Sequence, residues 1–526
     1  MKLLDQQVAL SIKSVSSIWR KDMRRKVLEG FALASVVLLV TACETTNSVV
    51  TLSTESTQAL VQYGQTDFDA TGAPEAHSEF LIGLLQLHNF EYADARNSFQ
   101  RALAIDPEFV MATWGEALTH WHPLWPTSNI EAAREIMSRL GSTTSARIQQ
   151  GQTERERDYL RTLEILLEGD NRQRARERYS DALLDLKTKY PDDLDAAAFY
   201  ALSLLARSGG RKPFFYMRAG AVTEEILDRN PLHPGALHYN IHSYDDPIHA
   251  PLGLRAARDY IKVAPSAVHA LHMGAHIFYP LAMWDEGVGR NKLSFHEAVS
   301  RQPNPDDRYH PETFHSLSWL PYGLQQQKKF DEALEYIALI ARQTELYPSF
   351  KMARMHYVEA RASFIIDTED WDHPLSSVVI DHSDLSPYSQ ITDLYLAGVI
   401  ALQRGDLESA ESALSRMRNP QVPLTGRRTN VAPALLQMAL TAQIAMAEGD
   451  HDAALRLLKR AADIETNWPL DVGPPQPVQP MAELLGDVYR ELGNVSEARK
   501  AYELSLEKAP GRIRTLAGLK ALPPAE

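Results

Sequence analysis

Two segments of the chain carry the same pair of histidines in the same arrangement. ALHYNIHSYDDPIHAPLG contains His238 and His242, and VHALHMGAHIFYPLAMW contains His272 and His276. Within each pair the spacing is four residues, which places both rings on one face of a helix. The pairs themselves are thirty-four residues apart, a period that indicates stacked helical repeats. We therefore expect like-numbered turns of consecutive repeats to lie side by side, and this register constrains the fold more than any other feature.

Similar helical units recur along most of the chain. The segment FLIGLLQLHNFEYADARNSFQRALAIDP places Gly83, Ala95, Phe99, Ala102 and Pro107 at small, small, aromatic, small and proline positions. The small residues allow the two helices of a unit to approach closely, the aromatic ring fills the space between units, and the proline ends the second helix. The same template fits LLGDVYRELGNVSEARKAYELSLEKAP near the C-terminus. The closing proline recurs at Pro191, Pro231, Pro265 and Pro510.

On these residues the chain resembles the tetratricopeptide repeat family over nearly all of residues 76–521. The resemblance implies an all-α solenoid, a right-handed superhelix of antiparallel helix pairs. It also implies a concave groove that binds protein or peptide partners, although such a fold hosts many functions. The segments rich in histidine and tryptophan also resemble uncharacterised bacterial lipoproteins with these repeats, a resemblance that supplies no activity.

The single cysteine, Cys43, suggests where the protein acts. A basic stretch that begins at Met23 precedes a short apolar run, residues 31–42, and Cys43 follows directly. This order resembles a bacterial lipoprotein signal, whose cysteine becomes the lipidated first residue; an ordinary signal peptide is the alternative. The apolar run is too short to span a bilayer. Glu44 follows the cysteine, and the resemblance to lipoproteins that lack Asp at this position implies the outer membrane over the inner one. The start of translation is open between Met1 and Met23.

The charge of the chain limits its partners. The net charge is −14, and residues 1–42 carry seven Lys/Arg against three Asp/Glu, so the rest of the chain is more acidic still. Such a chain is a poor binder of nucleic acid and is repelled by anionic lipid surfaces. We therefore expect a protein or peptide partner in the envelope, no nucleic acid, and membrane contact through the lipid anchor only, with the protein facing the periplasm.

Composition and repeat pattern together predict five segments. The stretch after Cys43 is rich in Ser and Thr with few large apolar residues, which is typical of a tether. The predicted segments are a signal peptide with lipobox (1–43), a flexible tether (44–75), a histidine-rich repeat array (76–366), an acidic linker loop (367–385) and a C-terminal repeat array (386–521).

Histidines concentrate at positions that face the groove in tetratricopeptide repeat proteins. If Gly287 occupies position 20 of its repeat, His269, His272 and His276 fall at positions 2, 5 and 9 of the first helix. His238 and His242 fall at positions 5 and 9 of the preceding repeat. The residues expected to contact a ligand in the groove are His88, His122, His269, His315 and Asp245.

Two opposing histidine pairs can also meet at one metal ion. Neighbouring helices lie roughly 8–10 Å apart, and two imidazoles with metal–nitrogen bonds of roughly 2 Å can bridge that gap. The carboxylates after His242 could complete the site or fix the ring tautomers. The expected metal ligands are His238, His242, His272, His276, Asp246 and His249, and the expected ion is a divalent transition metal, Zn or Fe.

Familiar enzyme motifs are missing from the sequence. It contains no H-E-x-x-H, zinc-finger spacing, G-x-S-x-G elbow, phosphate-binding loop or dinucleotide fingerprint. Two functions remain open. The first is a lipid-anchored scaffold that binds a protein, peptide or ligand in the bacterial envelope. The alternative is a metal-binding protein or metalloenzyme, a hydrolase or an oxygen-using enzyme, with a histidine/aspartate site in the groove of the N-terminal array.

Overall fold

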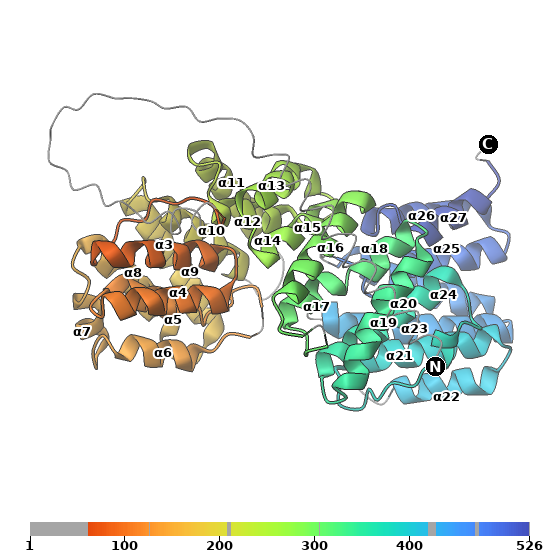
Figure 1. Ribbon diagram of the computed structural model, residues 1–526. Coiled ribbons are helices and arrows are strands. Elements are labelled where there is room, and N and C mark those ends of the chain that lie inside the picture. The colour runs from red at the N-terminus through yellow and green to blue at the C-terminus, as the bar shows by residue number, and fades with distance from the viewer. Residues whose placement is uncertain are drawn as a thin grey trace, which may run out of the picture. The chain divides into compact units, whose positions relative to one another are not determined.

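The structure is a computed structural model, and it describes residues 62–125, 127–207, 212–304, 306–418, 428–468 and 473–524, without the side chains of residues 428–430. Throughout these residues the regular elements are helices and no strand occurs, as Figure 1 shows. Consecutive helices pack against each other in antiparallel pairs that follow one another along the chain. The predicted all-α, tetratricopeptide-like solenoid is confirmed.

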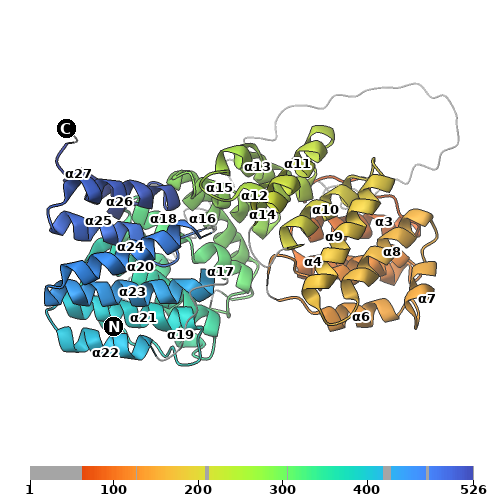
Figure 2. The same cartoon turned by 180° about the vertical axis from the view of Figure 1, so that it is seen from behind.

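The helices fall into three consecutive sets, and α12–α18 lie between the other two in both views (Figures 1 and 2). The first set is α3 (Pro74–His88), α4 (Tyr92–Ile105), α5 (Val110–Leu118), α6 (Ile130–Ser138), α7 (Thr144–Gln149), α8 (Glu154–Leu167), α9 (Arg172–Lys189), α10 (Leu194–Arg207) and α11 (Pro213–Arg229). The second set is α12 (Pro234–Tyr244), α13 (Ala250–Val263), α14 (Val268–Met273), α15 (Ala275–Phe278), α16 (Trp284–Ser300), α17 (Pro311–Leu317) and α18 (Leu320–Gln326).

The third set runs to the C-terminus and includes one short 3-10 helix. Its members are α19 (Phe330–Leu346), α20 (Lys351–Thr368), η1 (Pro374–Ser377), α21 (Pro387–Gln403), α22 (Leu407–Met417), α23 (Arg428–Glu448), α24 (His451–Thr466), α25 (Met481–Glu491), α26 (Val495–Lys508) and α27 (Ile513–Ala521).

The closing prolines end the second helix of their pairs as predicted. In each case the helix stops two residues before the proline, because a proline cannot donate the backbone hydrogen bond that would continue it. The helices concerned are α4, α9, α11, α13 and α26.

Glycines allow the helices of a pair to approach an aromatic ring. A Cβ atom on Gly83 would lie 2.9 Å from the ring of Phe99, and one on Gly115 would lie 2.5 Å from the same ring. Near the C-terminus, the ring of Tyr502 takes the place of Phe99 and packs against Gly486 in the same way. These contacts leave no room for a side chain, so the small and aromatic positions of the template are set by packing.

Two large hydrophobic cores and a small one formed by Ala275, Tyr279, Trp319 and Tyr322 fill the described array, and the two large cores do not divide at the expected loop. The first core extends from Phe68 to Phe278 and the second from Val288 to Leu522. The expected boundary, the acidic loop 367–385, belongs to the second core. Arg354 donates a hydrogen bond of 2.8 Å to the carbonyl of Asp381 in this loop, and Arg361 binds the carbonyl of Val378. Buried arginines therefore fix the loop against α20.

The folded array begins earlier than the predicted residue 76. Phe68 is 4% exposed and packs against Phe80 and Tyr159, with ring centroids 5.4 and 5.1 Å apart. The backbone N–H of Gln65 donates to the carbonyl of Leu232 at 2.9 Å. Residues 62–73 are thus part of the packed structure, because aromatic burial outweighs their polar composition. The predicted signal (1–43) and residues 44–61 of the predicted tether lie outside the described residues.

Among the described residues, one helix has the length and hydropathy of a membrane span. The stretch Val431–Glu448 of α23 is long and apolar enough to cross a bilayer, but 61% of it is buried inside the protein. It packs against α21, α22 and α24. This packing assigns α23 to the second core.

A cluster of charged side chains ties α20, α25 and α27 together. We call Arg512, Arg514, Asp367, Glu483 and Asp487 the arginine cluster. Arg512 is fully buried and bonds to Asp367 at 2.5 Å and to Glu483 at 2.7 Å. Arg514 bonds to Glu483 at 2.8 Å and to Asp487 at 2.7 Å. Every carboxylate of the cluster therefore faces a guanidinium group.

Candidate metal centre

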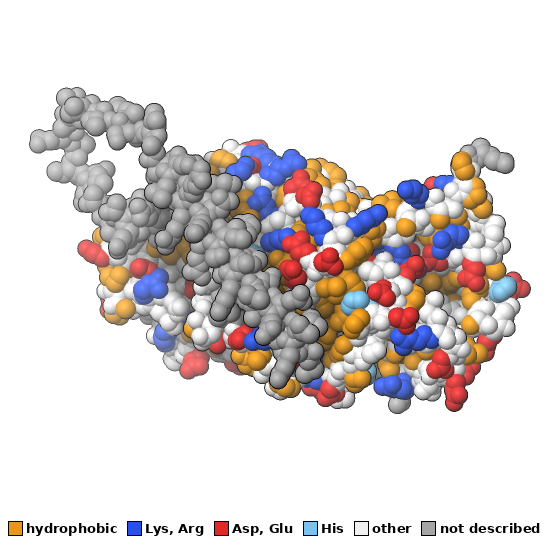
Figure 3. Space-filling view, turned by 45° about the vertical axis from the view of Figure 1, so that its right-hand side comes forward, with side chains coloured by type: hydrophobic (Ala, Val, Ile, Leu, Met, Phe, Trp, Pro, Cys, Tyr) orange, Lys and Arg blue, Asp and Glu red, His pale blue; other side chains and the backbone are white. Residues whose placement is uncertain are grey.

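Six histidines from four helices meet in the interior of the second helix set. We call His238, His242, His269, His272, His276 and His315 the histidine cluster. They come from α12, α14, α15 and α17. Four of the rings belong to residues that are at most 2% exposed: His238, His269, His272 and His276. On the face drawn in Figure 3, histidine reaches the visible surface at only a few points. The cluster is a polar core rather than the lining of an open groove.

The cluster divides into two groups of three. In the first group, His238, His242 and His269 bring one nitrogen each to within 4.8 Å of one another. The Nε2 atoms of His238 and His269 are 3.1 Å apart. This group combines a predicted histidine pair with a residue that the sequence assigned to the groove.

The second group repeats this arrangement. His272, His276 and His315 also bring one nitrogen each to within 4.8 Å of one another. Here the Nε2 atoms of His272 and His276 are 3.0 Å apart. The register predicted from the spacing of thirty-four therefore brings both histidine pairs to one place.

Asp245 connects the two groups. It follows the last residue of α12, is 2% exposed, and its Oδ2 atom accepts hydrogen bonds from Nδ1 of His242 at 3.2 Å and Nδ1 of His276 at 3.0 Å. His242, Asp245 and His276 themselves form a further set of potential ligand atoms within 4.8 Å. One carboxylate thus serves one histidine of each group.

Hydrogen bonds fix the tautomers of at least four of these rings. Nδ1 of His238 lies 2.8 Å from the carbonyl oxygen of His88, and Nδ1 of His242 and His276 face Asp245. Carbonyl and carboxylate oxygens only accept, so each Nδ1 carries the proton and, in the neutral ring, Nε2 carries a lone pair. Partners of this kind orient histidines at metal sites.

The tautomer of His272 follows from a longer chain of hydrogen bonds. The hydroxyl of Tyr279 donates to the carbonyl of Trp319 at 2.9 Å, so its oxygen accepts from the amide nitrogen of Asn291 at 3.1 Å. This orientation turns the amide oxygen of Asn291 toward Nδ1 of His272, which donates to it. Nε2 of His272 is then also an acceptor.

Two acceptor atoms therefore face each other at short distance. With both Nδ1 atoms protonated, the neutral rings of His272 and His276 point lone pairs at each other across 3.0 Å. Only a cation between them, a proton or a metal ion, makes this separation favourable. In addition, Nε2 of His242 is buried and has no hydrogen-bond partner among the described residues.

Burial favours the neutral form of these histidines. Burial and the neighbouring histidines lower the pKa of His238, His269 and His272 well below the ordinary value of 6.5. Burial, with the charges of His276 and His242, lowers the pKa of His315 to about 3. At neutral pH these imidazoles are unprotonated, the form that binds metal ions.

Aromatic rings enclose the cluster. The ring centroid of Phe90 lies 4.3 Å from that of His238, and the ring centroid of Trp125 lies 5.6 Å from that of His269. Trp319 stacks on His276 with the ring centroids 4.8 Å apart. Phe90 has a φ of 60° in the turn between α3 and α4, a left-handed conformation that the turn between α21 and α22 gives to Gly405. A bulky residue in this conformation is strained by roughly 1–2 kcal/mol, and its ring here contacts the cluster.

Two predicted ligands are not brought to the cluster. The carboxylate of Asp246 accepts from the backbone N–H groups of Ile248 and His249 and from Nδ1 of His249 at 2.8–2.9 Å. Asp246 thereby orders the turn before α13 and pairs with His249. The neighbouring Asp245, predicted only as a groove residue, is the carboxylate that faces the cluster.

The residues predicted to line the groove lie in different parts of the structure. His88 is fully buried and bonds to Asp195 at 2.8 Å and to Tyr239 at 2.9 Å, next to the cluster but outside both groups. His122 is half-buried, with Nδ1 2.7 Å from the hydroxyl of Thr127. His269, His315 and Asp245 belong to the cluster or contact it. Cys43, the predicted lipidation site, lies outside the described residues.

Sequence reasoning missed Asn291 and Tyr279, which orient His272. They lie on α16 and just after α15, and their role appears only when these helices are packed together.

The match to a known protein family lies in the C-terminal part of the chain. The sequence profile described as "Tetratricopeptide repeat-like domain" matches residues 357–521. This segment is a tetratricopeptide repeat-like domain. The histidine cluster lies before the matched segment, so the family match assigns nothing to it. No curated protein matches the chain.

Several solved structures are similar in fold to the whole array. A structure of the APC/C hetero-tetramer Cut9–Hcn1 is 16% identical, covers 86% of this chain and 77% of its own, and has a TM-score of 0.36. Yeast Tom70 is 10% identical, with 85% and 88% covered and a TM-score of 0.31. A human IFIT1 dimer with m7Gppp-AAAA is 16% identical, with 86% and 94% covered and a TM-score of 0.39. None of these likenesses identifies a ligand for this chain.

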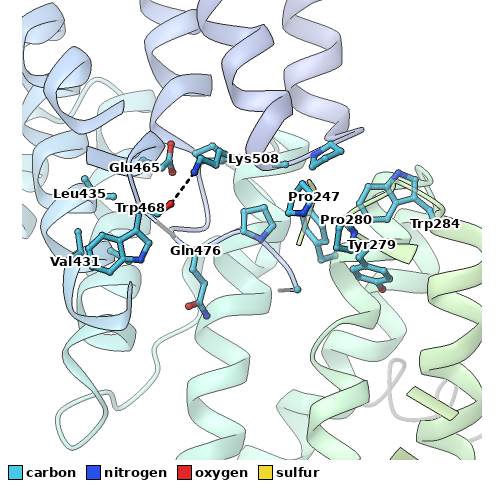
Figure 4. Close-up of a pocket in the computed structure, with 17 residues that line it drawn as sticks. Pro247, Tyr279, Pro280, Trp284, Val431, Leu435, Glu465, Trp468, Gln476 and Lys508 are labelled. Atoms are coloured by element: carbon cyan, nitrogen blue, oxygen red, sulfur yellow. Dashed lines mark hydrogen bonds between the residues drawn. The ribbon is translucent and has the colours of Figure 1, made fainter. Parts of the chain in front are cut away.

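The tetratricopeptide repeat-like domain also borders a pocket near the cluster. The pocket has a volume of about 810 Å³, part of which is open to solvent. Figure 4 shows Tyr279, Pro280 and Trp284 on one side and Val431 and Trp468 of the domain on the other. Since the ring of Tyr279 lies 5.2 Å from that of Trp319, which stacks on His276, these two rings separate the pocket from the cluster.

Proposed function

We propose that this protein binds transition-metal ions in the histidine cluster. The observation that carries the proposal is the pair His272 and His276, whose Nε2 lone pairs face each other at 3.0 Å in a buried site. Two nitrogens bound to one tetrahedral ion at about 2.05 Å lie about 3.3 Å apart, close to this distance. The pair His238 and His269, at 3.1 Å, supports the same interpretation.

The donor set indicates the class of ion. Six imidazoles and one carboxylate favour Zn²⁺, Cu²⁺, Ni²⁺ or Fe²⁺ and disfavour Mg²⁺ and Ca²⁺, which prefer oxygen ligands. Among ions that imidazole suits, affinity rises along the series to copper. We therefore name Cu²⁺ and Zn²⁺ as the first ions to test, with iron as the alternative. A hydrolase or an oxygen-using enzyme is the catalytic form of the same proposal.

Metal content tests the proposal directly. The full chain is purified, stripped with a chelator, incubated with Cu²⁺ or Zn²⁺ and desalted before its metal is counted by mass spectrometry. We expect at least one ion per chain in the wild type and a loss of bound metal in His242→Gln/His276→Gln. Metal content near zero in a folded wild-type protein contradicts the proposal.

His249→Gln is the matched control for this variant. His249 and Asp246 form a histidine–aspartate pair three residues apart in sequence, as His242 and Asp245 do, but they lie outside the cluster. The control should keep the metal content of the wild type. A loss equal to that of the double variant would show that the metal binds at surface histidines instead.

We further infer that the protein is lipid-anchored in a bacterial envelope, facing the periplasm. The support is the basic and apolar stretch before Cys43. Incorporation of labelled palmitate by cells that express the chain tests this inference. Label that persists in Cys43→Ala, or is missing from the wild type, contradicts it.

A protein- or peptide-binding scaffold is the second candidate function. It is supported by the repeat fold and by the pocket beside Tyr279, whose aromatic and proline side chains suit an apolar segment of a partner. Cross-linking in cells tests it with Trp284→Ala and Trp468→Ala. A partner lost in both variants but kept in His242→Gln/His276→Gln supports the scaffold, and an unchanged set of cross-links contradicts it.

A further inference from the structure

The number of imidazoles in the histidine cluster exceeds what one ion needs. Zn²⁺ in proteins is almost always bound by four ligands, or by three with one position open. The cluster offers six ring nitrogens in two groups of three, each group with its own set of ligand atoms within 4.8 Å. We propose that the cluster binds two metal ions, one in each group. This inference rests on the proposed function and makes it more specific.

Short contacts between ring nitrogens, one in each group, support two centres instead of one. His238 has its ring centroid 5.0 Å from that of His242 and 4.8 Å from that of His269. His272 lies 4.9 Å from His276 and 4.3 Å from His315. The third pair of each group is wider, 6.4 Å between His242 and His269 and 5.7 Å between His276 and His315. The short Nε2–Nε2 contact, one per group, therefore marks the two centres.

The two groups also touch each other. The rings of His242 and His276 are 5.2 Å apart, and those of His269 and His315 are 5.8 Å apart. Histidines of different groups are thus about as close as histidines of the same group. Two ions bound in this way would be neighbours, and neighbouring ions can act on one shared ligand.

Asp245 lies where a two-ion site needs negative charge. Its Oδ2 atom accepts hydrogen bonds from one histidine of each group, at 3.2 and 3.0 Å. A carboxylate in this position raises the basicity of both ligands and offsets part of the charge of both ions. Because the same oxygen orients His242 and His276, loss of this carboxylate should weaken both ions together.

Three protein ligands for each ion leave one tetrahedral position for a small exogenous ligand. Structural zinc sites use all four positions for protein ligands, whereas catalytic sites keep one for water or substrate. The proposed pair therefore has the ligand count of a reactive centre. Water or a small anion is the ligand class that two buried, neighbouring cations would bind.

Metal stoichiometry separates this inference from the proposed function. The full chain is stripped, loaded with Cu²⁺ or Zn²⁺ and desalted, and bound metal per chain is measured. We expect two ions per chain in the wild type, one in His238→Gln/His269→Gln and one in His272→Gln/His315→Gln, with two retained in the control His249→Gln. One ion per chain in the wild type overturns the two-ion inference and leaves the proposed function standing; no ion overturns both.

A spectroscopic measurement on the wild type keeps the test decisive if the double variants fail to fold. Two Cu²⁺ ions held by neighbouring groups couple magnetically, so the protein with two Cu²⁺ bound should lose most of its isolated-ion electron paramagnetic resonance signal. The signal should fall to less than half of the value expected for the copper present. A full, uncoupled signal from two bound ions overturns the paired site, and Asp245→Asn should weaken the retention of both ions together.

Discussion

Two buried polar clusters in the same helical array have opposite electrostatic character. In the arginine cluster, positive and negative groups face each other: the guanidinium of Arg512 bonds to Asp367 and Glu483 without any contribution from outside the chain. In the histidine cluster, neutral rings point acceptor atoms at one another, and Nε2 of His242 has no hydrogen-bond partner among the described residues. Every charge of the first cluster faces an opposite charge of the chain itself, whereas the second cluster consists of six imidazoles beside the single carboxylate of Asp245.

This difference distinguishes buried polar groups that stabilise the fold from buried polar groups that bind a ligand. A buried polar group is costly unless it is paired, so a cluster that pairs its own groups is explained by the fold alone. The arginine cluster joins α20, α25 and α27 in this way. The histidine cluster has the orienting hydrogen bonds of a metal site and a pair of facing ring nitrogens that a shared proton or a metal ion would join. The comparison predicts that changes in the two clusters have different consequences.

The largest effect is expected from Arg512→Met. This variant leaves Asp367 and Glu483 buried without their guanidinium partner, and we expect a loss of about 3–5 kcal/mol in unfolding free energy. Urea unfolding followed by circular dichroism measures the loss. The exposed pair Lys500–Glu497 provides a control, since Lys500→Met should leave the unfolding free energy nearly unchanged. Loss of bound metal from folded Arg512→Met would contradict the separate roles of the two clusters.

Acid should separate the two clusters by pH. Burial alone would raise the pKa of Glu483, but the charges of Arg512 and Arg514 outweigh burial and lower the pKa from 4.5 to about 2. Its stabilising contribution is therefore complete above pH 4.5 and is lost as the pH falls toward 2, a change of about 3 kcal/mol. Glu483→Gln should lack this part of the acid dependence when unfolding is measured between pH 5 and 2.

The histidine cluster should lose stability at a higher pH in the metal-free protein. Burial lowers the pKa of His315 from 6.5 to about 3, so the unfolded chain takes up its proton first. The stability contributed by the neutral ring is complete above pH 6.5 and decreases as the pH falls below it. His315→Gln should reduce the loss of stability between pH 6.5 and 5. The same slope in wild type and variant would contradict this assignment.

Bound metal should stabilise the protein only through the histidine cluster. A ligand that binds the folded state alone, at a hundred times its dissociation constant, stabilises a protein by about 2.7 kcal/mol for one site. We expect Zn²⁺ to raise the unfolding free energy of the wild type and of Lys500→Met by this amount or more. His242→Gln/His276→Gln should gain less than about 0.5 kcal/mol. An equal gain in all three proteins would place the metal elsewhere.

The fold could be predicted because its determinants are local. The closing prolines lie two residues after α4, α9, α11, α13 and α26, and Gly83 contacts Phe99 as the template requires. The convergence of His238, His242, His272 and His276 followed from the register alone, since a period of thirty-four residues stacks equivalent turns. The start of the array was misplaced because Phe68, which lies in a mostly polar stretch, is buried by helices far from it in sequence.

The choice between Asp245 and Asp246 could not be predicted in the same way. The two residues are adjacent, and which one faces the cluster depends on where α12 ends, a boundary that sequence patterns place only to within one or two residues. In the structure the chain leaves the helix at Asp245, with φ −76° and ψ 48°. The following Asp246 then turns toward His249. The positions of His269 and His315 in the cluster likewise depend on long-range packing.

The smallest effect is expected from Asn291→Ala, which tests whether the histidine cluster needs an orienting partner to bind metal. Its amide oxygen is hydrogen-bonded to the Nδ1 atom of His272, so Asn291→Ala should remove an orienting partner while leaving every proposed ligand in place. Loss of such a partner typically weakens metal affinity 10- to 100-fold, which is about 1.4–2.7 kcal/mol. We expect this loss in titrations with a competing chelator, with the stoichiometry unchanged.

Asn240→Ala is the matched control, because Asn240 is also a buried asparagine but bonds to Thr223 and Glu224 instead. Equal affinities in the two variants would mean that His272 needs no orientation by Asn291.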